Sequence, residues 1–364
     1  MEPPLGEAID KAVEELISLK ALDKQENLTA LGERMSYFAM HPQLSKALIH
    51  SALLKCLTPM LNIVVALSSE KKMFSFTSTR RENKQVKKKF CRSSDHIADY
   101  KIYSAFVERK SPNETKEFCS ENGLDESGLD HFRNVKKLYH ENLCESLIID
   151  ERKAISFYDL PSENIELVKA VFLSGVGNIM RHKLNIRDGF RMENSFESDN
   201  YLVSVANDSV NEDFEGKPSP FLTYYSSLFS SDEKCMIVRD CSVISPLSLI
   251  LFHPDDVGMR EVDQDNVTMA VLTVANHDIH CSVKDAKLLL SFRTLISDVL
   301  QFLIMEEGRV TDAGNYEKVI SFRNKLSLIL SDILMKEGEK IESYLSVKES
   351  DKQGPFSPAD EPNA

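Results

Sequence analysis

The chain has 364 residues, a formal net charge of −13 at pH 7 and 42% hydrophobic residues. This length allows two or three domains, and the hydrophobic content excludes an intrinsically disordered chain. The seven cysteines form no C-x-x-C pair, which excludes a disulfide framework and indicates an intracellular, reducing compartment, the nucleus or the cytoplasm or both. The start shows no leader peptide and the longest uncharged apolar run, 56–69, is too short to span a bilayer, so we expect no membrane partner.

The first half of the chain predicts helices only. Apolar residues recur with a helical period after Pro3 and Pro4, and Thr29 is suited to cap a short helix that ends near Phe38. Segment 70–92 is polar and basic, and no element is predicted there. Further helices are predicted over 43–57, 59–67, 94–108, 112–120 and from Asp125 to about 143.

The second half changes from a helical period to a period of two. After a linker at 150–161, Ser162 is predicted to cap a helix that ends near Gly175. Short strands separated by polar turns then predict a small barrel. The strands are expected over 179–186, 201–205, 221–229, 236–243, 247–252 and 269–274. Helices return over 285–305 and 315–335, and 341–364, with three prolines after Glu349, is predicted to be a disordered tail.

One segment is strongly basic although the chain as a whole is acidic. Between residues 80 and 92 seven basic residues stand against one acidic residue, Glu82, whereas the rest of the chain has 37 basic and 56 acidic residues. Such a cluster can follow a phosphate backbone, or it can be an ordinary solvated surface. The seven are Arg80, Arg81, Lys84, Lys87, Lys88, Lys89 and Arg92.

Six short sequence elements occur in a fixed order over roughly the first 300 residues. They are Leu19 to Gly32 with Pro42 and Cys56-Leu-Thr-Pro59; Ser94-Asp95-His96 with Ser104-Ala105-Phe106; Phe118-Cys119 with Asn122-Gly123-Leu124; the helix 165–175; Ser209-Val210-Asn211; and Arg239-Asp240-Cys241 with Ser245-Pro246. Together they resemble the region behind the motor of DEAH-box RNA helicases, in the branch that contains RNA helicase A and the G-quadruplex-resolving helicases.

The resemblance implies an α+β fold, a helical ratchet bundle followed by a small OB-like β-barrel and C-terminal helices. It places a winged-helix remnant at 1–40, the helicase-associated (HA2) ratchet at 41–150, an OB-fold at 163–280 and a helical extension at 281–340. The chain departs from the family pattern in having no Trp, in having Ala206-Asn207 where His-Pro is usual, and in an acidic segment at 193–199. The incomplete winged helix suggests a fragment, an alternative product or a shortened gene.

The resemblance implies RNA or single-stranded DNA binding by the accessory part of a helicase. No G-x-x-x-x-G-K-[ST] loop and no DEAH tetrapeptide occur, so we expect no catalytic residues and no cofactor in this chain, and ATP and Mg²⁺ would belong to the motor domains. The alternative is an acidic protein-interaction module that docks on a helicase motor or on its protein activator. An enzyme of another kind is a distant third.

The predicted nucleic-acid-binding residues extend beyond the basic cluster. His96 near a helix start could meet a phosphate, or it could pack locally beside Ser94 and Asp95. Lys101, on the same predicted helix as His96, is a further predicted nucleic-acid-binding residue. Arg181 and Lys183 alternate on one predicted barrel strand and could hold a single strand, or they could form an ordinary exposed face. His277-x-x-His280-Cys281 lacks a second pair of ligands, so no metal site is predicted.

Overall fold

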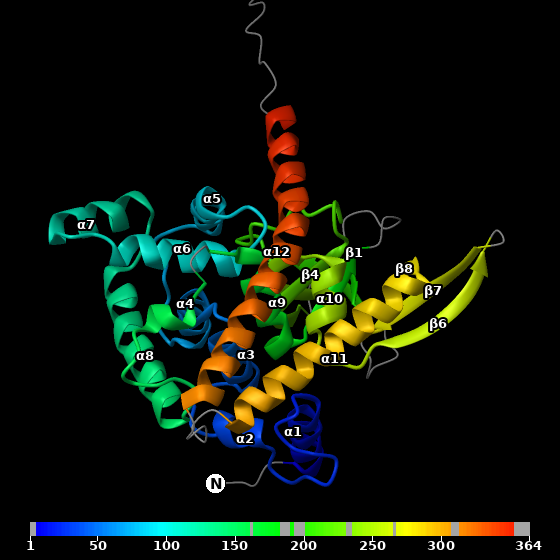
Figure 1. The fold of residues 1–364 in the computed structure, drawn as a ribbon. Helices are drawn as coiled ribbons and strands as arrows, with labels where there is room; N and C mark the ends of the chain where they lie inside the picture. Colours follow the sequence, from blue (N-terminus) through cyan, green and yellow to red (C-terminus); the bar gives the residue numbers. More distant parts are fainter. Residues whose placement is uncertain are drawn as a thin grey trace, which may run out of the picture.

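The computed structural model describes residues 5–160, 163–182, 190–192, 201–230, 235–264, 267–306 and 313–352. It shows an α+β fold in which a helical half is followed by a small β domain and two long helices (Figure 1). The predicted fold class is therefore confirmed at the level of a helical bundle with a small β domain. The termini of the described chain lie at opposite ends of the molecule, with α1 at the bottom and α12 leaving at the top (Figure 1).

The chain begins with two helices at the bottom of the molecule, α1 (Gly6–Ser18) and α2 (Ala30–Met35). The Thr29 hydroxyl accepts a hydrogen bond from the Gly32 amide at 3.0 Å, so Thr29 caps α2 as predicted. A side chain at Gly32 would lie 2.1 Å from the Ala21 carbonyl oxygen. The close approach of these two segments therefore requires glycine.

Six helices form the next layer of the molecule. They are α3 (Pro42–Leu53), α4 (Leu57–Ser68), α5 (Arg80–Phe90), α6 (Asp95–Val107), α7 (Pro112–Glu121) and α8 (Glu126–Glu145). Helix α4 is buried over most of its surface, as its apolar sequence predicted. Helix α5 was not predicted. Its sequence is too polar to give an apolar stripe, but Thr79 and Glu82 form a capping box that starts it, and Val86 is its buried anchor.

A 3₁₀ turn, η1 (Ile155–Tyr158), leads to α9 (Ile165–Val176), which is buried along almost its whole length. The Asn164 side chain accepts hydrogen bonds from the amides of Glu166 and Leu167 and so caps α9. The predicted cap, Ser162, lies outside the described residues. Helix α9 is the centre of the molecule, since it packs against α3 on one side and α12 on another.

The five strands β1 to β5 close into a barrel with the order β1-β2-β3-β5-β4. Strands β3 and β5 pair in parallel and the other neighbours are antiparallel. The barrel core is formed by buried apolar side chains such as Val203, Leu222 and Val238. The strands are β1 (Ile179–His182), β2 (Phe190–Met192), β3 (Tyr201–Val205), β4 (Phe221–Ser230) and β5 (Cys235–Ile244).

The chain after the barrel differs from the prediction in two respects. The predicted strand 247–252 is wrong, because these residues form helix α10 (Pro246–Phe252), which the Ser245 hydroxyl caps at 3.0 Å from the Ser248 amide. The predicted strand 269–274 lies in a separate three-stranded sheet rather than in the barrel. This sheet consists of β6 (Gly258–Gln264), β7 (Val267–Val274) and β8 (His277–Ser282), and its β6–β7 hairpin projects from the body (Figure 1).

Two long helices end the described chain, α11 (Val283–Glu306) and α12 (Ala313–Lys352). They diverge from a common end at the lower left of the molecule and form a V (Figure 1). The disordered tail predicted from residue 341 is wrong as far as Lys352, because Ile341 is buried in the barrel core and α12 continues beyond it. The barrel core therefore holds this part of α12 in place.

Candidate nucleic-acid interface

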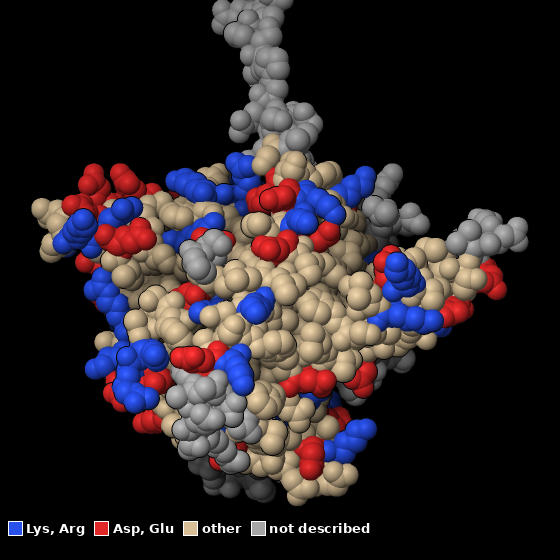
Figure 2. All heavy atoms as spheres, in the orientation of Figure 1, with Lys and Arg blue, Asp and Glu red and all other residues tan. Residues whose placement is uncertain are grey.

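The basic cluster forms helix α5 at the upper edge of the molecule, where Lys and Arg side chains gather (Figures 1 and 2). A hollow of about 630 Å³ lies between α5 and the loop that follows β3. Polar and charged side chains line this hollow: Thr79, Arg80, Arg81, Lys84, Gln85, Lys88, Asn207 and Glu212. Four of the seven predicted cations therefore face one concave surface. A polar, cation-rich hollow suits a phosphate-bearing chain better than an apolar ligand.

Three cations of the cluster point to solvent. Arg80, Arg81 and Lys89 are exposed, and among the described residues no acidic side chain forms an ion pair with them. Arg92 lies at the other end of the helix, where its guanidinium is 3.5 Å from the Ser346 hydroxyl of α12. Arg80, Arg81 and Lys89 are thus the side chains that can meet a backbone phosphate without first losing an internal partner.

Two cations of the hollow are held by acidic side chains of the loop after β3. The Lys84 ammonium contacts the Glu212 carboxylate and lies 3.0 Å from Asp213 Oδ2. Lys88 lies 3.7 Å from the same Asp213 oxygen. Sequence analysis missed Glu212 and Asp213, because they are about 125 residues away from α5 in a chain that is rich in acidic residues. A phosphate that enters the hollow must compete with these two carboxylates.

Lys87 points into the protein, which corrects its assignment as a phosphate contact. Its ammonium lies 3.6 Å from Asp95 Oδ1 and 3.5 Å from Asp99 Oδ1, and the residue is 8% exposed. Burial alone would lower the pKa of Lys87, but Asp99, Asp95 and Asp240 together hold it above its usual value. Lys87 fell on the buried face because helical geometry turns it away from Lys88 and Lys89.

The three carboxylates around Lys87 include one with a strongly raised pKa. Burial, with further contributions from Asp240 and Asp95, raises the pKa of Asp99 to about 7 against the opposing effect of Lys87. Burial also raises the pKa of Asp240, against the opposing effect of Lys87. One ammonium group lies among three carboxylates, of which Asp95 is buried and Asp99 and Asp240 are half-buried, so this site favours the protonated form of Asp99.

Asp95 joins the helical half to the barrel. Its Oδ1 accepts a hydrogen bond from the Val210 amide at 2.9 Å. Its Oδ2 accepts from the Cys241 amide at 2.9 Å and from the Ser209 hydroxyl at 2.5 Å. Three of the sequence elements that carried the resemblance thus meet at one buried carboxylate. Their role in this structure is to fix α6 against the barrel.

His96 is also buried, which corrects its assignment as a phosphate contact. Its Nδ1 lies 2.6 Å from the Ser242 hydroxyl and its ring lies 4.1 Å from the Phe172 ring of α9. Burial lowers the pKa of His96 to about 3, so the ring is neutral at physiological pH. Local packing, the alternative interpretation from the sequence, is what the structure shows.

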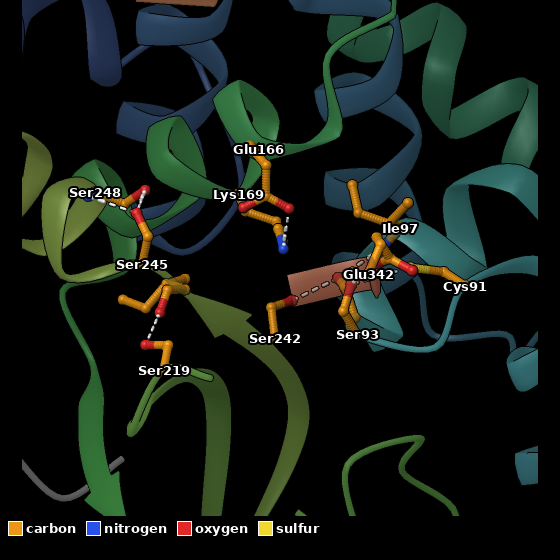
Figure 3. A network of polar contacts seen from close by, with 12 residues as sticks. Cys91, Ser93, Ile97, Glu166, Lys169, Ser219, Ser242, Ser245, Ser248 and Glu342 are labelled. Carbon is orange, nitrogen blue, oxygen red and sulfur yellow. Dashed lines mark hydrogen bonds and ion pairs between the residues drawn. The ribbon is translucent and has the colours of Figure 1, made fainter. Parts of the chain in front are cut away.

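The buried polar contacts around His96 extend to α12. The Ser242 hydroxyl of β5 lies 2.6 Å from the Ser94 hydroxyl, and the hydroxyl of the preceding residue, Ser93, donates to Glu342 of α12 at 2.7 Å (Figure 3). The Glu166–Lys169 ion pair of α9 lies beside them (Figure 3). This polar junction therefore connects the ratchet, the barrel, α9 and α12.

The remaining predicted site residues lie apart from α5 in the sequence and are only partly described. Lys101 is a half-buried residue of α6. Arg181 lies on β1 with its guanidinium 5.8 Å from the centre of the Phe221 ring. Lys183 and the acidic segment 193–199 lie outside the described residues. Their predicted contribution to binding stays a prediction.

Comparison with known proteins places the chain in a helicase context. Residues 12–40 match the winged-helix model of the helicase-associated domain (HA2), and residues 41–98 match its ratchet-like model. The chain is 26% identical over 275 residues to the human ATP-dependent DNA/RNA helicase DHX36, an alignment that covers 74% of this chain and 27% of the relative. It is 25% identical over 327 residues to the chicken ATP-dependent RNA helicase DHX30, with 84% of this chain and 26% of the relative covered.

The chain is homologous to the C-terminal regions of these DEAH-box helicases. The resemblance predicted from the sequence is confirmed, and the chain corresponds to a helicase-associated accessory region. It spans about a quarter of the length of the curated relatives that it matches. The alignment alone therefore does not assign the activity of a full-length relative to this chain.

Proposed function

We propose that this chain binds RNA or single-stranded DNA as the accessory region of a DEAH-box helicase. The observation that carries the proposal is the polar hollow beside α5, with four basic side chains on its wall and Lys89 exposed on the same helix. Arginine and lysine side chains on one surface supply most of the sequence-independent affinity for a phosphate backbone. The helicase relatives, one of which is named as acting on DNA and RNA, support the same function.

The barrel supports an OB-fold as the second half of this binding surface. Five strands in the order β1-β2-β3-β5-β4 with a parallel β3–β5 pair agree with that fold. OB-folds hold single strands with basic and aromatic side chains, and Arg181 on β1 would supply the basic side chain. The proposal places the strand across the hollow at α5 and then along the barrel.

The motor supplies the chemistry in this proposal. ATP and Mg²⁺ act on domains that the chain does not contain, and the accessory region holds the strand that the motor moves. RNA and a helicase motor are accordingly the proposed partners, in the nucleus or the cytoplasm. The chain alone should neither hydrolyse ATP nor unwind a duplex.

A salt titration with matched charge reversals tests the binding function. The probe is a fluorescein-labelled single-stranded RNA of mixed sequence, and its anisotropy is followed from 50 to 300 mM NaCl. The parent should bind with an affinity that falls steeply with salt. Arg80→Glu combined with Arg81→Glu should weaken binding at least tenfold at low salt and flatten the salt dependence.

The control is Lys116→Glu combined with Lys137→Glu, which changes the net charge equally on the exposed faces of α7 and α8. It should keep most of the parent affinity. Equal losses in both double variants would mean that only net charge matters. Salt-independent binding, or none, would reject the proposed function.

A further inference from the structure

Helices α11 and α12 carry apolar side chains that no other part of the described protein covers. Leu288, Leu295 and Phe302 of α11 are 44% to 66% exposed, and Phe322 and Ile329 of α12 are 49% and 50% exposed. Neighbours within each set are seven residues apart, which is close to two helical turns, so each set forms a straight stripe. Two such stripes on neighbouring helices mark an interaction surface rather than scattered exposure.

Each stripe runs beside the core-facing side of its helix. Ile296 and Leu303 of α11 and Leu330 of α12 each follow a stripe position by one residue, about 100° around the helix, and pack in the core. One flank of each helix borders the V (Figure 1), and a right-handed helix that buries these residues turns its stripe to that flank. Figure 2 shows a broad area without Lys, Arg, Asp or Glu between the two helices. The area is bounded by helices whose backbones are fixed by the core, so it is preformed.

The rim of the V is basic. Lys318, Lys325 and Lys336 follow one line along α12 beside its apolar stripe, and Lys284 continues the stripe of α11. All four are exposed, and in the part of the chain that the structure describes none of them has an ion pair. Among the described residues of these helices, the four lysines outnumber Asp298 and Asp332, the carboxylates that lie near the same lines.

We propose that the V between α11 and α12 binds an amphipathic helix that has an apolar stripe and acidic flanks. A helix of this kind would insert its apolar residues at i, i+3, i+4 and i+7 between the two stripes, while its acidic side chains meet the lysines of the rim. The apolar stripes supply the affinity and the rim selects the charge of the partner. The partner class is therefore a protein segment and not a nucleic acid, because the exposed side chains along the two walls of the V are apolar and the area between them shows no Lys or Arg (Figure 2).

The length and composition of α11 suggest a membrane surface as the alternative occupant of the V. Val283–Met305 is long and apolar enough to cross a bilayer by length and composition. Its apolar content, however, divides between the core-facing side and the stripe in the V, and Arg293 of the same stretch donates to the carbonyls of Ile250 and His253 at 2.6 Å. The structure therefore favours a protein helix held between two walls.

Two helical peptides of about 18 residues test the proposal. Both carry the same leucine stripe, and they differ in having glutamate or lysine on the flanks. Binding to the full chain is measured by fluorescence anisotropy. The glutamate peptide should bind at least tenfold more tightly than the lysine peptide, and Lys325→Glu combined with Lys336→Glu should abolish or reverse this preference.

The chain offers a matched control for the apolar stripes. Leu295→Glu combined with Ile329→Glu should weaken the glutamate peptide at least tenfold. Leu328→Glu combined with Met335→Glu, at positions equally exposed on the other flank of α12, should leave it within about twofold. Circular dichroism should show that both double variants are folded.

Three results would overturn the proposal. The first is that the glutamate and lysine peptides bind with equal affinity, or that both apolar double variants lose the same affinity for the glutamate peptide. The second is a concentration-dependent dimer that only Leu295→Glu with Ile329→Glu dissolves, which would assign the V to a second copy of this chain. The third is flotation of the chain with phosphatidylcholine and phosphatidylserine vesicles that the same variant prevents, which would assign it to a lipid surface.

Discussion

The Lys87 ammonium lies 3.6 Å from Oδ1 of Asp95, inside the junction between the helical half and the barrel. Asp95 in turn accepts hydrogen bonds from Val210 and Cys241, on two segments of the β domain. The central residue of the basic cluster is therefore a structural residue, and the exposed cations proposed to bind phosphate surround it on the same helix. The same segment of sequence fixes the junction and presents the proposed phosphate-binding face.

Removal of Lys87 should destabilise the protein. Lys87→Ala leaves Asp95 and Asp99 buried without their ammonium partner, which should lower the free energy of unfolding by about 3 kcal/mol or more. Lys89→Ala, at an exposed position of the same helix, should change it by less than about 0.5 kcal/mol. Urea unfolding followed by circular dichroism measures both. Equal stabilities for the two variants would contradict the internal role of Lys87.

Stability should depend on pH through Asp99. Its pKa is raised to about 7 in the folded protein from an ordinary value of 3.8, so the folded state binds more protons than the unfolded state between these values. The contribution of Asp99 to stability is present at low pH and is lost as the pH rises through about 7. The free energy of unfolding of Asp99→Asn relative to the parent should therefore increase from pH 5 to pH 8. A difference that is constant over this range would argue against a raised pKa for Asp99.

The acidic side chains beside α5 should weaken RNA binding. Glu212 and Asp213 pair with Lys84 and Lys88, so Glu212→Gln combined with Asp213→Asn removes two negative charges that compete with phosphate for these cations. Affinity for single-stranded RNA should rise severalfold at low salt, and its salt dependence should become steeper. Glu117→Gln combined with Glu121→Gln on α7 is the control for the change in net charge. An equal rise in RNA affinity in the control variant would show that the effect comes from net charge and not from the contacts of Glu212 and Asp213.

The barrel should contribute to single-strand binding through β1. Arg181→Ala combined with Lys183→Ala should weaken single-strand binding by about 1 to 3 kcal/mol if both side chains contact phosphate or bases. Duplex binding should change less. Parent-like affinity for single strands across a salt titration would remove β1 from the interface.

The sequence predicted most helices and strands because their apolar periods are clear, and it failed where local signals compete. Residues 247–252 are apolar except for Ser248, as in a buried strand, but Ser245 and Pro246 start a helix there. Helix α5 has almost no apolar stripe, so only its capping box could have revealed it. Local capping and hydrophobic period thus have to be weighed together.

The site could be predicted only as a segment and not as a set of side chains. The basic run pointed to α5, but the sequence does not tell that Lys87 faces Asp99 across two helices, or that His96 packs on Phe172. Asp95, Ser209 and Cys241 were noticed as separate sequence elements. Their convergence at one carboxylate depends on tertiary contacts between residues 114 and 146 positions apart.

The most direct test of the central claim is to map where RNA touches the chain. A single-stranded RNA containing 4-thiouridine is cross-linked to the full chain at 100 mM salt, and the cross-linked peptides are identified by mass spectrometry. The account predicts cross-links to α5 and to the loop 206–213, reduced by Arg80→Glu with Arg81→Glu and unchanged by Lys116→Glu with Lys137→Glu. Cross-links confined to other surfaces, with neither double variant affecting them, would contradict it.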